Sequence, residues 1–369
     1  MRFKTRISLV SILVILSTFM LATASFAYYN DQTITPAPNP SNNVSSSKTW
    51  TYTDPNYDSK LFVSNDPEAT NQYGILAKDS EINGTGMFRV FWTHINNTGG
   101  NGYIGFGLKN TGTTTAKVYF KKRAYGIGSI SASLGQQVFY DWLQSSSSEY
   151  LYATLNPGQY TWVSFLTSHG QACTGMYDVV IKDSYGNLRP NGIQLRTYIT
   201  WASGGDPSSI WDNTALPRDG LSHTRARFDH ASKYLNWSSA ATNSQITFTS
   251  KPGGNNWPTP TNDLDRGYSE TDNNYQYNYG NYGQDLNITV QLSANSALVL
   301  DPSLPADNNG GNTTHYLATY VSNRGNLRKT LSSNTGWVIT TGSAGQTITV
   351  KTSLPAFEMA PLHLVVLPN

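Results

Sequence analysis

The sequence predicts an all-β protein with two antiparallel β-sandwich domains of Ig-like or jelly-roll-like type, and three observations indicate this. The chain has 369 residues, which is enough for two hydrophobic cores. Charged residues make up only 13%, and Glu occurs five times, so the residues that usually cover helix surfaces are scarce. Gly, Pro and Tyr are abundant, which favours short strands joined by polar turns.

Residues 1–27 have the features of a secretory signal peptide. Three basic residues within the first six precede a mostly apolar run over 7–22, and Ser25 and Ala27 are the small residues that a signal peptidase recognises. The alternative is a permanent membrane anchor, but Ser and Thr interrupt the run and it is short for a span. We therefore predict cleavage after Ala27 and a secreted or surface-associated protein without a transmembrane segment.

The exported chain is close to neutral. Cleavage removes three of 25 basic residues and none of the 23 acidic ones, so the net charge changes from +2 to −1. No Lys/Arg cluster lies among aromatic residues, which argues against nucleic acid as a partner. The single cysteine, Cys173, has no internal disulfide partner. Burial as a small apolar residue is the usual outcome for such a cysteine, and a reactive or intermolecular thiol is the alternative.

Residues 28–48 are predicted to form an extended, solvated arm. Pro36, Pro38 and Pro40 alternate, and the residues from 42 to 47 are almost all polar. One interpretation is a passive spacer. The other is that the β-forming residues 33–35 add as a strand to a neighbouring molecule.

Residues 49–200 are predicted to form the first sandwich. Within 87–94 the apolar side chains alternate, so Phe88, Val90 and Trp92 share one face. Asn-Thr-Gly at 110–112 and Asn-Pro-Gly at 156–158 are turn sequences. Strands are expected at 87–94, 102–109, 117–124, 150–155, 160–166, 176–182 and 193–200, with one helical turn or more at 139–143.

Residues 201–219, rich in Gly and Pro, are predicted to form a linker, and residues 220–369 a second sandwich. The Asn-, Pro-, Gly- and Tyr-rich stretch 251–285 is predicted to be one long loop, and long loops often carry binding sites. Strands of this half are expected at 224–228, 232–236, 245–249, 286–292, 297–300, 316–321, 336–340, 347–352 and 362–367.

Several short motifs resemble a group of secreted, two-domain, β-rich proteins of spore-forming Gram-positive bacteria. They are LPRDGLSHTRARF at 216–228, YGNYGQDLNIT at 279–289 and ALVLDP at 297–302, together with segments of 107–124, 156–158 and 176–178. Some of those proteins occur beside a domain named after the N-terminal part of copper amine oxidases, without the catalytic part. The resemblance spans about residues 50–369. It implies an exported β protein, and it implies no established activity and no functional residue.

Calcium is the one metal that the sequence makes a candidate. Asp263, Asp265 and Asp272 lie in one predicted loop, and Asp301, Asp307 and Asn309 lie near a second. Hard cations take six to eight oxygens from flexible loops, but Asp and Asn are also ordinary turn residues. His223 and His230 are seven residues apart and would lie on opposite faces of a strand, so no zinc or copper site is predicted.

Motifs for catalysis are weak. No Gly-x-Ser-x-Gly nucleophile motif occurs, and Ser168, His169 and Cys173 lack a third group to orient them. No carboxylate pair for glycoside hydrolysis can be nominated.

Aromatic residues give the clearest signal for binding. Tyr275, Tyr277 and Tyr279 alternate and would share one face of an extended segment. Tyr282 and Trp257 lie in the same predicted loop, and Trp201 and Trp211 lie in the predicted linker. Aromatic faces contact the C–H faces of sugars while their O–H or N–H groups reach hydroxyls. The alternative is that these rings fill the sandwich cores.

The sequence therefore predicts an exported, non-enzymatic structural or adhesive protein of the cell surface or extracellular matrix, assembling with like subunits through its arm. A carbohydrate-binding protein that uses Trp257 and Tyr275–Tyr282 is the alternative, and a hydrolase with an unrecognised site is the third hypothesis. No cofactor is expected apart from calcium at the site named above.

Overall fold

A computed structural model describes residues 27–369 except 39, 41, 45–48, 53–58, 83, 190, 222, 249–263, 279–280, 303–313, 333, 355, 357–361 and the side chain of Asn43. The predicted signal peptide lies outside the described residues apart from Ala27. About 55% of the described residues are in strands and 7% in helices, which confirms the all-β prediction. Within the described ranges no helix is both long and apolar enough to cross a membrane.

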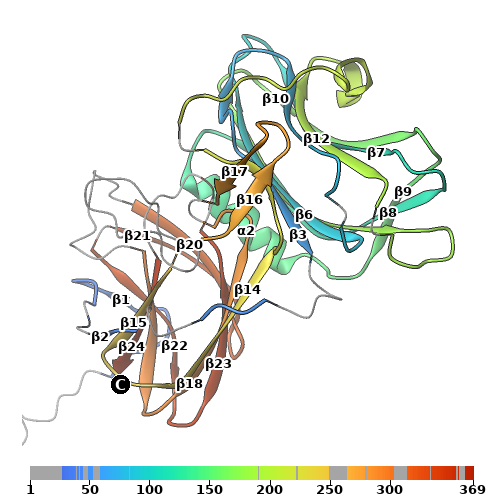
Figure 1. Ribbon diagram of the computed structural model, residues 1–369. Coiled ribbons are helices and arrows are strands. Elements are labelled where there is room, and N and C mark those ends of the chain that lie inside the picture. Colours follow the sequence, from blue (N-terminus) through green and yellow to red (C-terminus); the bar gives the residue numbers. More distant parts are fainter. Residues whose placement is uncertain are drawn as a thin grey trace, which may run out of the picture.

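The first sandwich packs a nine-stranded sheet against a four-stranded sheet (Figure 1). Phe88, Val90 and Trp92 enter its core as predicted, while Phe91 faces the other side of the sheet. The larger sheet has the order β17-β16-β13-β3-β6-β11-β8-β9, with β4 beside β6: β3 Lys60–Ser64, β4 Ala69–Thr70, β6 Met87–Asn96, β8 Ala116–Gly128, β9 Tyr150–Leu155, β11 Ala172–Lys182, β13 Arg225–Phe228, β16 Arg266–Ser269 and β17 Asn274–Tyr277. The smaller has the order β10-β7-β12-β5: β5 Gly74–Asp79, β7 Gly102–Asn110, β10 Tyr160–Thr167 and β12 Ile193–Thr200.

The second sandwich packs a six-stranded sheet against a five-stranded one around a separate core that includes Trp237, Phe248 and Trp337. The six-stranded sheet has the order β1-β22-β19-β24-β15-β2: β1 Thr33–Ile34, β2 Asn42–Asn43, β15 Ser244–Phe248, β19 Ser296–Asp301, β22 Gly336–Gly342 and β24 Leu362–Pro368. The other has the order β14-β18-β23-β20-β21: β14 Ser232–Ala240, β18 Asp285–Leu292, β20 Thr314–Val321, β21 Gly325–Ser332 and β23 Thr347–Thr352.

Most pairs among the described strands are antiparallel, as predicted, but four are parallel: β3 and β4 each with β6, β14 with β18, and β2 with β15. Nor do the sheets follow the predicted division at residue 220. Strand β13 pairs with β3, and the β16–β17 hairpin extends β13, so all three belong to the first sandwich. This hairpin occupies part of the stretch predicted to be one long loop, because Arg266–Ser269 and Asn274–Tyr277 pair with each other.

Residues 201–219 pack on the first sandwich instead of forming a free linker. Ile210 and Ala215 cover Ile75 and Tyr198 on the outer face of the four-stranded sheet. Trp211 is fully buried there, and Gly107 leaves room for it, since a Cβ at that position would lie 2.8 Å from the indole. Short 3₁₀ turns at Ser203–Gly205 and Ser208–Ile210 shape the segment. Apolar burial therefore overrides its Gly- and Pro-rich composition.

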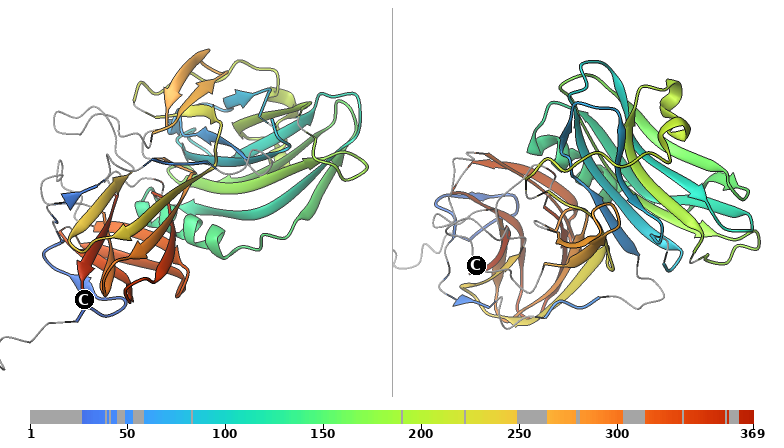
Figure 2. Two further views of the ribbon diagram at one scale, coloured as in Figure 1. Left: turned by 60° about the horizontal axis from the view of Figure 1, so that its bottom comes forward. Right: turned by 45° about the horizontal axis from the view of Figure 1, so that its top comes forward.

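The predicted solvated arm is docked on its own chain. Strand β1 pairs with β22, and β2 pairs in parallel with β15, so the arm lies at both edges of the six-stranded sheet. Tyr28 and Ile34 pack on the outer face of that sheet. Figure 2 shows the blue arm segments against the second sandwich, which is coloured yellow to red.

Helix α2, Ala132–Gln144, lies between the sandwiches (Figure 1), where a helical turn or more was predicted. Its Trp142, Phe139 and Val138 pack on the first sandwich. Its Gln136 side chain donates to the carbonyl oxygens of Leu317 and Lys329 in the second sandwich, at 2.8 and 2.9 Å. The helix thus joins the two halves.

A buried ion network crosses the same junction. The Arg89 guanidinium of β6 donates to Asp178 of β11 at 2.6 Å and to Asp285 of β18 at 2.7 Å. It also donates to the carbonyl oxygens of Ala231 and Gly283. Burial alone would raise the pKa of Asp285, but Arg89 and Lys351 hold this pKa below its ordinary value.

We predict that Arg89→Met lowers the free energy of unfolding by about 3–5 kcal/mol, because it removes the cation between Asp178 and the buried Asp285 and leaves Asp285 paired with Lys351 alone. Urea denaturation at pH 7 measures this, with the exposed Arg266→Met as the control, expected within about 0.5 kcal/mol of the parent. A carboxyl with a lowered folded pKa stabilises above its unfolded pKa of about 3.9 and loses that contribution as pH falls. The difference between parent and variant should therefore shrink below about pH 4, and equal stability at pH 7 would contradict the prediction.

Candidate functional site

Three tyrosines and one arginine form an exposed surface on the inner face of the larger sheet of the first sandwich. We call Arg123, Tyr125, Tyr150 and Tyr152 the tyrosine ledge. Strand β9 is the edge of the nine-stranded sheet and β10 is the edge of the smaller sheet. In the β8–β9 register Phe120 faces Tyr150, and a bulge next to Tyr119 leaves Tyr152 without a direct partner residue.

Two of the three ledge rings pack on phenylalanines, and all three remain exposed to solvent. Tyr125 stacks on Phe165 of β10, with ring centroids 3.6 Å apart, and Tyr152 packs on Phe120 at 4.5 Å. The Tyr152 hydroxyl donates to the Trp162 carbonyl oxygen at 2.5 Å. Tyr125, Tyr150 and Tyr152 nevertheless remain 48%, 54% and 37% exposed. This arrangement offers rigid aromatic faces to a ligand.

Charge and polar groups border the ledge. The Arg123 guanidinium lies 5.1 Å from the centre of the Tyr150 ring, a cation–π distance. Beyond Tyr152 a hollow of about 570 Å³ continues between β9 and β10, with Thr154, Gln159 and Asp206 in its lining. One of its two aromatic lining residues, Trp162, donates its ring N–H to the Gly204 carbonyl oxygen at 3.0 Å, which fixes the indole. The ledge and this hollow together combine apolar faces with hydrogen-bonding groups.

The aromatic residues that the sequence nominated are only partly brought together. Tyr275 and Tyr277 share the exposed side of β17, at 61% and 38% exposure. The Arg266 guanidinium lies 4.6 Å from the Tyr275 ring centre, so this patch, like the ledge, combines exposed tyrosines with one arginine. Tyr282 instead packs against Phe91 in the junction between the sandwiches. Trp257 and Tyr279 lie outside the described residues.

The two tryptophans of the predicted linker differ from each other. Trp211 is buried, whereas Trp201 is exposed and touches Tyr73 edge-on at 5.6 Å. The tyrosine ledge was not among the residues predicted from the sequence, although Tyr150 and Tyr152 show the same alternation as Tyr275 and Tyr277. That alternation was the signal that would have found them.

The predicted calcium ligands are held by basic side chains. Asp265 accepts from the buried Lys233 ammonium at 3.1 Å and from the Tyr52 hydroxyl at 3.0 Å. Asp272 pairs with Arg225 at 2.5 Å. Asp263 lies outside the described residues, as do Asp307 and Asn309 of the second loop, while Asp301 is buried at the end of β19. Among the residues that the structure describes, no cluster of three His, Cys, Asp or Glu side chains is arranged to hold a metal ion.

A serine and a histidine do lie side by side in the first sandwich. The His94 ring donates from Nδ1 to the Pro67 carbonyl oxygen at 2.7 Å, so its Nε2, 2.9 Å away, accepts from the Ser64 hydroxyl. Both side chains are fully buried, and burial lowers the pKa of His94 to about 4. With a carbonyl in place of an orienting carboxylate and no exposed surface, the pair has the geometry of a core hydrogen bond.

The other histidines and the cysteine are dispersed. His223 contacts Asp219 at 2.6 Å and Glu68 at 3.2 Å, whereas His230 stacks on Tyr52. Cys173 is buried and its sulfur accepts from the Trp92 ring N–H, so the predicted apolar role is confirmed.

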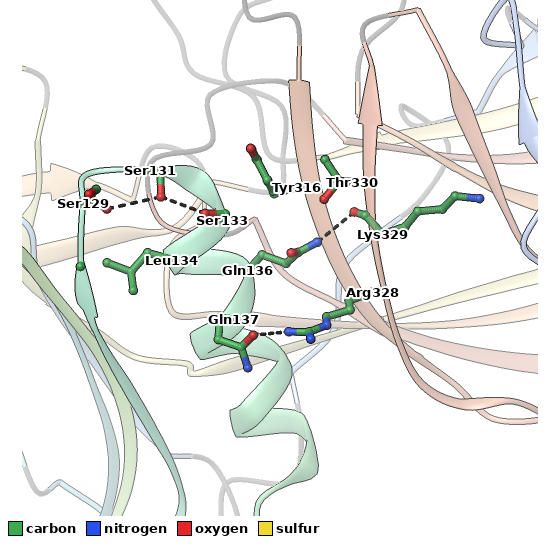
Figure 3. Close-up of a pocket in the computed structure, with 11 residues that line it drawn as sticks. Ser129, Ser131, Ser133, Leu134, Gln136, Gln137, Tyr316, Arg328, Lys329 and Thr330 are labelled. Carbon is green, nitrogen blue, oxygen red and sulfur yellow. Dashed lines mark hydrogen bonds between the residues drawn. The ribbon is translucent and has the colours of Figure 1, made fainter.

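A cleft of about 690 Å³ lies where α2 meets β20 and β21 (Figure 3). Its lining is polar and includes Ser131, Ser133 and Tyr316. Gln137 faces Arg328 across it and accepts a hydrogen bond from the guanidinium. Its polar groups therefore bond across the junction and help to hold the two sandwiches together.

Comparison with known proteins does not identify a family. No family model and no curated protein matches the chain, so the resemblance to secreted proteins of spore formers stays a prediction. The CUB1-EGF-CUB2 domain of human MASP-1/3 aligns over 72% of this chain and 93% of its own, at 10% identity and a TM-score of 0.15. The tandem CBM22-1–CBM22-2 domain of Paenibacillus barcinonensis Xyn10C aligns over 92% of this chain and 98% of its own, at 8% identity and a TM-score of 0.14. Such scores carry no functional argument.

We predict that Cys173 resists thiol reagents in the native state. Burial raises the pKa of its thiol to about 12, and only the thiolate reacts quickly. Iodoacetamide treatment followed by mass spectrometry should show no adduct in buffer and full alkylation in urea. Rapid alkylation of the folded chain would contradict the buried position.

Proposed function

We propose that this protein is a non-catalytic adhesive component of the cell surface or extracellular matrix, and that it binds polysaccharide through the tyrosine ledge. The observation that carries the proposal is a set of three exposed tyrosine rings, two of which, Tyr125 and Tyr152, are held in place by phenylalanines beneath them. Large apolar rings usually leave the solvent, and a group of exposed ones is typical of a binding surface.

The chemistry of the ledge suits sugars. The ring faces match the C–H faces of pyranoses, and the Arg123 guanidinium supplies several hydrogen-bond donors beside Tyr150. Because packing already orders the Tyr125 and Tyr152 rings, binding to them costs little side-chain entropy. The hollow beside Thr154 and Gln159 extends the same surface, which favours a chain of sugar units over a single one.

The Tyr275–Tyr277 patch supports adhesion as the biological role. It lies on β17, and β9 with the ledge is at the other end of the same nine-stranded sheet. Two aromatic surfaces on one rigid sheet suit contact with a long polymer or with two polymers. A non-catalytic role is favoured because the Ser64–His94 pair is fully buried in the core, where a substrate does not reach it.

We predict that Tyr150→Ala lowers affinity for the bound polysaccharide at least about tenfold, equivalent to about 1.4 kcal/mol of stacking. A glycan array with bacterial-wall and plant polysaccharides identifies the ligand, and titration calorimetry measures the affinity. Tyr185→Ala is the matched control, because Tyr185 is 90% exposed on the turn after β11 and does not belong to the ledge.

Tyr275→Ala in the same series separates the two aromatic surfaces. A loss for Tyr275→Ala alone would move the proposed site to β17. If the array shows no polysaccharide bound by the parent chain, or if Tyr150→Ala and Tyr185→Ala bind equally well, the ledge proposal is wrong.

A further inference from the structure

We propose that residues 28–44, the N-terminal arm, also dock on the second sandwich of another copy of this chain, so that the protein self-associates by arm exchange. This inference goes beyond glycan binding and concerns another surface. It rests on how the arm is seated, on what it covers and on where it is attached.

The arm is the outermost strand at both edges of the six-stranded sheet. Thr33 and Ile34 pair with Trp337 and Gly336 of β22, and on the far side Asn42 pairs with Ser244 of β15. Each paired strand of the arm is only two residues long, whereas β19 and β24 pair over six residues, and single backbone hydrogen bonds at Asp31, Gln32, Ala37 and Val44 extend the contact. When the arm leaves, β22 and β15 each become an edge with unpaired N–H and C=O groups, which is a template for a strand of another molecule.

The arm also covers an apolar face. The outer side of the six-stranded sheet carries five aliphatic residues that are at most 7% exposed: Ala297, Val299, Val338, Val365 and Leu367. Tyr28 and Ile34 pack against them. Exposing these five residues to water is unfavourable by about 25 cal/mol per Å² of apolar area. We call this face, with the β22 and β15 edges, the seat of the arm, and a seat without an arm is strongly disfavoured. Release of one arm therefore favours capture of another.

Specific polar contacts determine which segment fits the seat. The Asp31 carboxylate pairs with Arg324 at 2.6 Å and accepts from the Trp337 ring N–H at 3.2 Å. The Asp31 amide donates to the Val338 carbonyl oxygen, and the Val338 amide donates to the Gln32 carbonyl oxygen, both at 2.9 Å. These contacts define one register, and an identical sequence reproduces all of them. A second copy of this chain is therefore the partner that fits.

The attachment of the arm permits exchange. Just after it, Thr51 is bridged to Tyr234 of β14, so the rest of the fold does not need a docked arm to hold this point. The 17 arm residues span at most about 60 Å when extended, at about 3.3–3.6 Å each. Each copy donates one arm and offers one seat, which gives a closed dimer or an open chain of copies.

The test mixes two populations of the chain beginning at Tyr28, with different C-terminal affinity tags. We expect the two tags to co-purify to an extent that rises with protein concentration, and light scattering to show complexes of two or more copies. Ile34→Asp in both populations should reduce co-purification at least about tenfold, because a carboxylate replaces the apolar anchor. Ile130→Asp makes the same change at an exposed position outside the arm and should leave co-purification unchanged.

Amide hydrogen exchange shows whether the Ile34→Asp variant is still folded, so a loss of association can be separated from a loss of folding. In Ile34→Asp the Val338 amide should lose protection, while amides of β6 and β18 in the sheet interiors stay protected. The proposal is overturned if the parent chains remain monomeric at the highest soluble concentration. It is also overturned if folded Ile34→Asp associates as well as the parent. Glycan binding by the ledge is measured separately, so failure here leaves the proposed function untouched, and the reverse also holds.

Discussion

The arrangement of the whole molecule depends on the burial of one guanidinium. Arg89 sits between the sandwiches, with Asp178 from the first, Asp285 from the second and the Trp142 ring of α2 4.4 Å from its centre. A buried charge is tolerated only when its partners surround it, and the partners of Arg89 come from both halves of the chain. The network therefore selects one relative placement of the sandwiches, and a displacement of either half would leave charges buried without partners.

That constraint gives the surfaces fixed positions. The tyrosine ledge and the β17 patch lie at the two ends of one sheet, and the seat of the arm lies on the other sandwich. In each case the surface is at a sheet edge, where side chains and backbone groups are less covered than in the interior. The chain fills or blocks some edges with its own segments, as residues 28–44 do, and it leaves tyrosines exposed at others.

Features that depend on the alternation of side chains along one strand were predicted correctly from the sequence. Phe88, Val90 and Trp92 face the core, and Tyr275 and Tyr277 share an exposed face, because both follow from the two-residue period of a strand. Features that depend on contacts between residues far apart in the sequence were predicted poorly. Arg89 meets Asp285 across 196 residues, β13 joins β3, and Trp211 docks into the space over Gly107. The arm was predicted to be solvated because its composition is polar, while its docking depends on Ile34 and on an apolar face formed over 260 residues later in the chain.

Self-association through the arm would strengthen polysaccharide binding, because each assembly would then carry several tyrosine ledges. A shallow aromatic surface buries little of its ligand and binds each sugar segment weakly, which is the regime in which several linked sites matter most. Arm exchange would place ledges at repeated positions, and the Arg89 junction would keep each ledge at a constant distance from the seat of the arm. Linked sites raise avidity only when their geometry allows simultaneous contact, so a rigid junction is more useful for this purpose than a flexible linker. The same buried network that joins the sandwiches would thereby determine the spacing at which an assembly contacts a polymer.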